Sequence, residues 1–77
     1  MNSRDNLIYM ANQIARNFAT LDDAAAANAI AAHIVKYWDP RMRVKIIDSL
    51  EQNESKLLPV SRNAVAVLRD THQSDAP

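Results

Sequence analysis

Apolar side chains recur along this chain every three or four residues, which is the spacing of amphipathic helices. The first such stripe predicts a helix over residues 5–19, with Ser3 or Asp5 as its N-terminal cap. One side of this helix is expected to face the core. Its members are Leu7, Met10, Ala11, Ile14 and Phe18.

A second helix is predicted over residues 23–38, after a short link at Thr20 and Leu21. Asp22 or Asp23 is suited to cap it, because an aspartate side chain accepts hydrogen bonds from the first free N–H groups of a helix. The helix is rich in alanine, whose small side chain allows a neighbouring helix to approach closely. The predicted seam consists of Ala27, Ile30, Ala31, Ile34 and Trp38.

A third helix is predicted to begin at Pro40, because Asp39 is a favourable N-cap and proline suits the first helical position. A residue before proline avoids the α conformation, so the second helix should end near Asp39. The boundary is therefore a sharp corner between two helices. The apolar side of the third helix is expected to contain Arg43, Ile46, Ile47 and Leu50.

The remaining pattern predicts a polar loop over residues 51–56 and a fourth helix from Pro59, with Leu57 or Leu58 packing just before it. Residues 71–77 show no apolar pattern and are predicted to form a disordered tail. The fold class is all-α: residues 1–70 form one domain, a small bundle of about four helices. The core face of the fourth helix is expected to contain Val60, Ala64, Val67 and Leu68.

The amino-acid composition excludes several classes of binding and catalytic site. The 77 residues include no glycine and no cysteine, which excludes glycine-rich phosphate loops, dinucleotide fingerprints, disulfides and thiolate ligands. A core of this size usually yields only about 3–5 kcal/mol, so a partner is a candidate stabiliser. No run of about 18 apolar residues predicts a membrane span, and residues 1–6 do not resemble a signal peptide. The chain is therefore predicted to be cytoplasmic.

No constellation of polar side chains predicts catalysis. His33 and His72 are far apart in sequence and lack metal-ligand spacing, and the serines are interpreted as solvated or capping residues, Ser49, Ser55 and Ser61 among them. The prediction is that the chain has no catalytic, cofactor-binding or metal-ligating residue and is not itself an enzyme.

Charge is concentrated at the predicted corner. The chain has nine basic and nine acidic residues, but residues 36–45 contain four basic side chains and only one acidic one. Two of the basic residues, Arg41 and Arg43, fall in the first turn of a helix, where the helix dipole favours acidic side chains by about 0.3–1 kcal/mol each. Their charges should be satisfied either by an acidic group of this chain, such as Asp39, Asp48 or Glu51, or by a partner. The residues predicted to bind a partner are Tyr37, Trp38, Asp39, Pro40, Arg41, Met42 and Arg43.

Two alternatives remain open at this corner. Trp38 is either a core residue that closes the end of the second helix or an anchor of an interface. A small helical DNA-binding or adaptor protein is the alternative function, because a short helical array with a basic helix start resembles a helix-turn-helix. Arg41 and Lys45 share one helical face while Arg43 points elsewhere, which makes a short patch for phosphate contacts.

Two strings in the chain carry a family resemblance. Residues 10–14 read Met-Ala-Asn-Gln-Ile, and residues 37–43 read Tyr-Trp-Asp-Pro-Arg-Met-Arg, with Phe18 and His33 between them. Together they resemble the delta subunit of the cytoplasmic, molybdenum-containing, NAD-dependent formate dehydrogenases of bacteria. The likeness extends over residues 6–68.

This resemblance implies an accessory subunit without catalytic residues of its own. Other subunits of such a complex would hold bis-molybdopterin guanine dinucleotide, iron–sulfur clusters and FMN, and would use NAD. The delta chain would support assembly, stability or molybdenum-cofactor loading of the large catalytic subunit, its expected partner. Neither nucleic acid nor membrane is an expected partner, and the isolated chain is a candidate for self-association.

Overall fold

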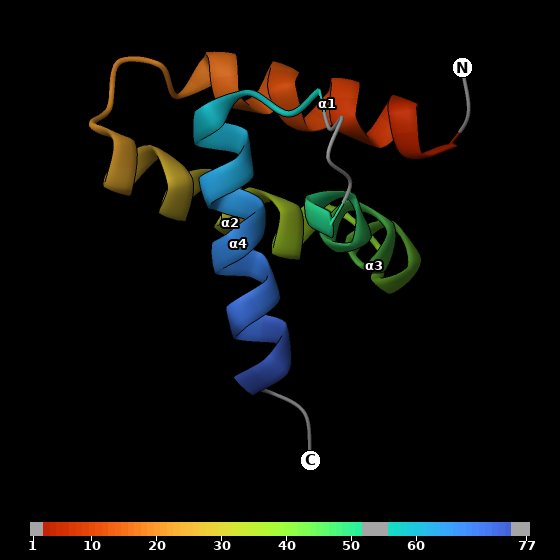
Figure 1. Ribbon diagram of the computed structural model, residues 1–77. Helices are drawn as coiled ribbons and strands as arrows, with labels where there is room; N and C mark the ends of the chain where they lie inside the picture. Colours follow the sequence, from red (N-terminus) through yellow and green to blue (C-terminus); the bar gives the residue numbers. More distant parts are fainter. Residues whose placement is uncertain (1–2, 52–55, 75–77) are drawn as a thin grey trace.

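The last helix of the chain passes across the second at a steep angle, with the first helix above this crossing and the third to its right in Figure 1. The computed structural model describes residues 3–51 and 56–74. In the described residues the elements are helical and no strand occurs, so the all-α prediction of about four helices is confirmed. They are α1 (Ser3–Asn17), α2 (Asp23–Tyr37), α3 (Pro40–Asp48), the short 3₁₀ turn η1 (Ser49–Glu51) and α4 (Pro59–Ser74).

The starts of α2 and α3 follow from local capping. Asp22 Oδ1 accepts a hydrogen bond from the backbone N–H of Ala25 at 2.8 Å, and Asp39 Oδ1 accepts one from Met42 at 3.0 Å. Trp38 is extended, with φ −97° and ψ 141°, which ends α2 at Tyr37. Both predicted caps are thus confirmed, because each depends only on neighbouring residues.

The core lies between all four helices, and most predicted stripe positions are buried in it. On α1 the buried face is rotated relative to the prediction: Ile8 and Ala15 are buried, whereas Met10 is 40% exposed. Helices α2, α3 and α4 all contact α1. Ile8 and Ala15 belong to the core cluster that these helices form, together with the predicted Leu7, Ala11 and Ile14. The prediction that Met10 belongs to the core stripe is wrong.

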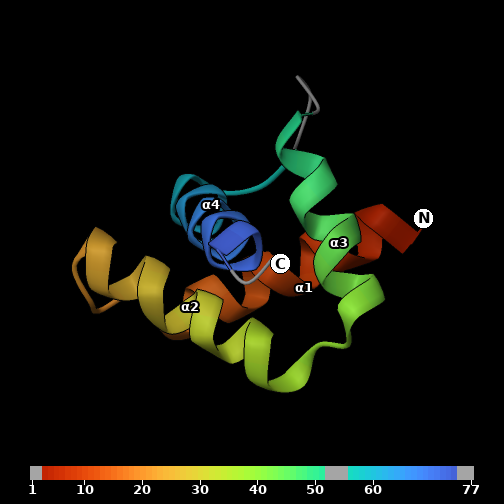
Figure 2. The same ribbon diagram turned by 90° about the horizontal axis from the view of Figure 1, so that it is seen from below.

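The most extensive helix pair is α2 with α4 (Figure 2). Small side chains on both helices allow this close crossing, and among them Ala27 and Ala64 are almost completely buried. Two serines that were interpreted as solvated or capping residues are buried: Ser61 on α4 and Ser49 in η1. The Ser49 hydroxyl donates to the carbonyl of Ile46 at the end of α3. Ser61 Oγ has no hydrogen-bond partner within the described residues, so small volume is what suits serine to that position.

The chain returns to α4 through a segment that α1 holds in place. Asn12 Nδ2 donates to the carbonyl of Lys56 at 3.0 Å, and Asn12 Oδ1 accepts from the N–H of Leu58 at 2.9 Å. Leu57, between these two contacts, is buried, as the predicted packing before Pro59 requires. One amide therefore satisfies two backbone groups 44 and 46 residues away.

We expect Asn12→Ala to lower the free energy of unfolding by about 1–2 kcal/mol, because it removes both hydrogen bonds from the segment before α4. Amide hydrogen exchange at Leu58 should also become faster. Asn28→Ala, at an exposed position of α2, is the matched control and should leave both quantities nearly unchanged. Unchanged exchange at Leu58 in the Asn12 variant would contradict this role of the amide.

The last helix is longer than its apolar pattern. It continues to Ser74, four residues into the segment for which the sequence predicted disorder, while residues 75–77 and the predicted loop positions 52–55 lie outside the described residues. Apolar periodicity reports burial, and Figure 1 shows that the end of α4 extends away from the other helices.

Among the described residues, no helix is both long and apolar enough to cross a membrane.

Candidate functional site

The corner between α2 and α3 contains all seven residues that were predicted to bind a partner. The structure divides them into residues that hold the corner together and residues that face outward. This division follows from burial and from the hydrogen bonds that each side chain makes.

Trp38 belongs to the core. Only 5% of its surface is exposed, and it is part of the same buried cluster as Ile34 and Ile46. Its extended backbone turns the side chain inward at the point where α2 ends. Of the two alternatives for Trp38, the structure therefore supports core packing, and the indole is not an exposed anchor.

Arg43 is satisfied within the chain, although not by an acidic group. Its Nη1 donates to the carbonyl of Trp38 at 2.9 Å and to that of Val35 at 3.3 Å. These carbonyls lie at the C-terminal end of α2, which carries partial negative charge. An arginine that opposes the dipole of its own helix thus complements the dipole of the preceding one. Of the possibilities left open for Arg43, pairing with a carboxylate is not found among the described residues, and backbone carbonyls accept its hydrogen bonds instead.

Asp39 and Pro40 also serve the fold. Asp39 caps α3 through Met42, as described above, and Pro40 occupies the first helical position. Met42 is half-buried and packs against the core cluster. The corner is consequently held by its own cap, by a buried indole and by a guanidinium that joins two helices.

Tyr37 and Arg41 are the outward-facing members of the predicted set. Tyr37 is 64% exposed; its ring lies 4.7 Å from that of His33 and 5.4 Å from Lys36 Nζ. Arg41 is exposed, and no hydrogen bond or ion pair of its side chain is found within residues 3–51 and 56–74. Exposed tyrosine and arginine side chains are typical of interface anchors.

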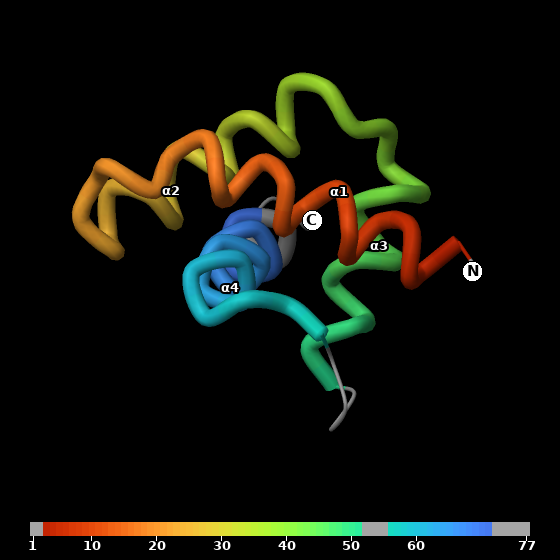
Figure 3. Tube along the Cα trace, turned by 90° about the horizontal axis from the view of Figure 1, so that it is seen from above, coloured from red at the N-terminus to blue at the C-terminus, as the bar shows by residue number. Residues whose placement is uncertain are grey.

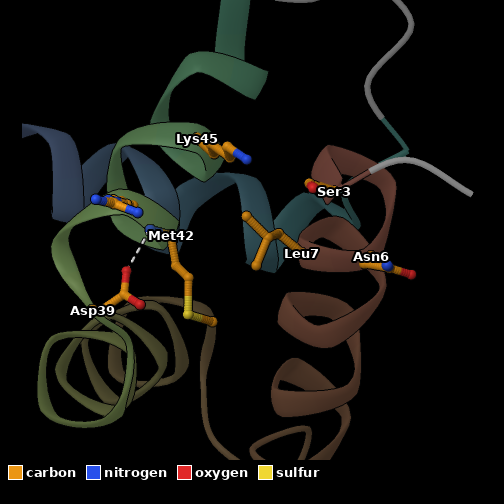
Figure 4. A pocket seen from close by; sticks show the side chains of 7 residues that line it. Ser3, Asn6, Leu7, Asp39, Met42 and Lys45 are labelled. Carbon is orange, nitrogen blue, oxygen red and sulfur yellow. Dashed lines mark hydrogen bonds between the residues drawn. The ribbon is translucent and has the colours of Figure 1, made fainter.

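The first half of α1 lies beside helix α3 (Figure 3). A cleft of about 270 Å³ lies between the first two turns of α1 and α3, next to this corner (Figure 4). Figure 4 shows Leu7 and Met42 between the two helices, with Lys45 reaching from α3 toward α1. The sequence showed Arg41 and Lys45 on one helical face, but it did not show that α1 lies opposite them. The lining residues are Ser3, Asn6, Leu7, Asp39, Arg41, Met42 and Lys45.

The charged side chains elsewhere form few contacts. The ion pair found in the described part of the chain joins Arg69 Nε to Asp70 Oδ1 at 3.4 Å, and both side chains are well exposed. No group of three or more His, Cys, Asp or Glu side chains among the described residues is placed to hold a metal ion. His33 lies against the ring of Tyr37.

The chain matches the model of a known protein family. This family is described as "NADH-dependent formate dehydrogenase delta subunit FdsD", and its model matches residues 6–65, a segment that contains most of α1, all of α2 and α3, and the first part of α4. It includes both Asn12 and the corner. Comparisons with curated proteins and with solved structures found no match.

Proposed function

Because the chain belongs to the family of delta subunits of NADH-dependent formate dehydrogenase, we propose that it is a non-catalytic accessory subunit. In this role it binds the large catalytic subunit and supports its assembly, its stability or the loading of its molybdenum cofactor. The observation that carries the proposal is the family match, which extends over residues 6–65.

Residues 10–14 and 37–43, which carry the family resemblance, have structural roles, and this supports a structural function. Asn12 holds the segment before α4, Trp38 fills the core, and Arg43 joins α2 to α3. These side chains build a rigid helical surface, and the chemistry of formate oxidation is assigned to other subunits. In the proposed complex those subunits hold bis-molybdopterin guanine dinucleotide, iron–sulfur clusters and FMN, react with NAD and reside in the cytoplasm.

The surface that we assign to partner binding is the outward part of the corner. Tyr37 and Arg41 are exposed there, and Arg41 also helps to line the cleft between α1 and α3. The remaining members of the predicted set, Trp38, Asp39 and Arg43 above all, act by fixing the shape of this surface.

Deletion of the chain separates the proposed roles. The other subunits are expressed with and without it, and three quantities are measured: subunit stoichiometry after purification, molybdenum per catalytic subunit, and formate-dependent NAD reduction. We expect activity to fall in either case. An assembly role predicts loss of subunits from the complex, whereas a loading role predicts an intact complex with less molybdenum.

Presence of the chain in purified active enzyme is the second measurement. A permanent subunit should copurify in a fixed ratio, and a transient loading factor should be absent from the mature complex. An enzyme made without the chain that has full activity, full molybdenum and all other subunits would overturn the proposal.

A further inference from the structure

We propose that the cleft between α1 and α3 binds a peptide segment of another formate dehydrogenase subunit, one that presents a carboxylate next to an apolar side chain. This inference rests on the proposed function and names the chemistry of the partner surface. It is carried by the charges, the apolar lining and the size of the cleft.

The charge of the cleft favours an anion. Arg41 and Lys45 are four residues apart on α3, so both lie along the same side of the cleft. Both side chains are exposed, and neither makes a hydrogen bond or ion pair within residues 3–51 and 56–74. The acidic residue of the lining is Asp39, and its Oδ1 already accepts a hydrogen bond from the N–H of Met42. The lining thus contains two cations without side-chain partners among the described residues and one carboxylate that already caps a helix.

The ends of two helices add to this positive potential. Ser3 and Asn6 belong to the first turn of α1, and Asp39 and Met42 belong to the start of α3. Helix N-termini carry partial positive charge, which favours anionic groups nearby. An incoming carboxylate would therefore meet two side-chain cations and two favourable helix ends.

The interior of the cleft is apolar, which distinguishes it from a simple basic patch. Leu7 and Met42 lie between α1 and α3, and Figure 4 shows the Lys45 amino group projecting over this region toward α1. The thioether of Met42 is flexible enough to adapt to a second apolar side chain. A nucleic-acid backbone would leave this apolar surface without a partner, whereas an acidic peptide with a leucine-like neighbour would use both parts.

The size of the cleft agrees with a peptide side chain as the occupant. Its volume of about 270 Å³ lies at the lower end of the roughly 300–1,000 Å³ typical of small-molecule and cofactor sites. It has room for one or two side chains. Arg43 is not part of this surface, since α2 carbonyls already hold its guanidinium.

Carbodiimide cross-linking of the assembled complex tests the inference, because this reagent joins an amine directly to a carboxylate in contact with it. We expect a cross-link from Lys45 to an aspartate or glutamate of another subunit, located by mass spectrometry. Lys45→Arg keeps the positive charge and removes the amine. It should retain association and lose the cross-link.

Charge reversal provides the affinity test. The double variant Arg41→Glu, Lys45→Glu should bind the other subunits about tenfold or more weakly, because like charges would then face each other across the interface. Arg16→Glu, at the opposite end of α1, is the matched control and should bind as the wild type does. Circular dichroism should show that all variants remain helical, because the substituted side chains are exposed.

The outcomes separate the inference from the proposed function. If the wild-type chain copurifies with the other subunits but the double variant binds equally well, or cross-links arise only from other lysines, the cleft assignment is overturned and the accessory role stands. Association that nuclease treatment abolishes would also overturn it. If the wild-type chain does not associate with any subunit during assembly, the proposed function itself fails.

Discussion

Trp38→Ala is expected to leave most of the isolated chain unfolded at room temperature. Truncation of a fully packed tryptophan costs about 3–5 kcal/mol, because transfer energy is lost and a cavity remains. Trp38 is only 5% exposed and is packed in the core with Ile34 and Ile46. A single core in a chain of this length contributes about 3–5 kcal/mol in total, so the loss is comparable with the whole stability.

Thermal denaturation followed by circular dichroism measures this effect. The variant should lack a cooperative transition or show one tens of degrees lower, at about 4–8 °C per kcal/mol for a domain of this size. Tyr37→Ala is the matched control, since Tyr37 is the neighbouring aromatic residue and is 64% exposed. Its stability should change by no more than about 0.5 kcal/mol. Equal transitions in the two variants would show that Trp38 is not a core residue.

Arg43→Ala is expected to lower the free energy of unfolding by about 1–3 kcal/mol, because hydrogen bonds that involve a charged group are stronger than neutral ones. The substitution leaves the carbonyls of Val35 and Trp38 without their shared donor. The end of α2 should therefore fray, which should lower the helix content seen by circular dichroism. Urea denaturation should measure the lower free energy of unfolding.

Arg41→Ala, on the same helix turn, is the control for Arg43→Ala. Arg41 is exposed and has no hydrogen bond in the described part of the chain, so its removal should leave stability unchanged. Arg43→Lys should retain part of the stability, since an ammonium also donates to carbonyls at a helix C-terminus. Equal stability losses for the two alanine variants would contradict the distinction between the arginines.

These results bear on how binding is measured. A Trp38→Ala or Arg43→Ala variant that fails to associate with other subunits reports damage to the fold. Arg41→Ala and Tyr37→Ala alter exposed side chains and report contact with a partner. The distinction comes from burial and hydrogen bonding, which the sequence string at residues 37–43 does not reveal.

Local chemistry made the helix boundaries predictable. Asp22 and Asp39 were recognisable as caps because capping involves residues only three positions away. Apolar periodicity likewise predicted most of the core, including Ile30, Ile34 and Leu68. It overestimated the burial of Met10, because periodicity locates an apolar stripe on a helix but does not show from which direction other helices approach that stripe.

Contacts between distant segments were not predictable from the sequence. Nothing local indicates that Asn12 binds the backbone before α4, and the spacing of Arg41 and Lys45 does not show that Leu7 lies opposite them. The sequence by itself determined the all-α class, the starts of α2 and α3 and the family, since these depend on local patterns and on recognisable strings. Only the tertiary structure decided that Trp38 is buried, that Arg43 is satisfied by α2 and that Arg41 and Lys45 have no partner in the described chain. The physical reason is that burial and pairing depend on which surfaces the packed helices bring together.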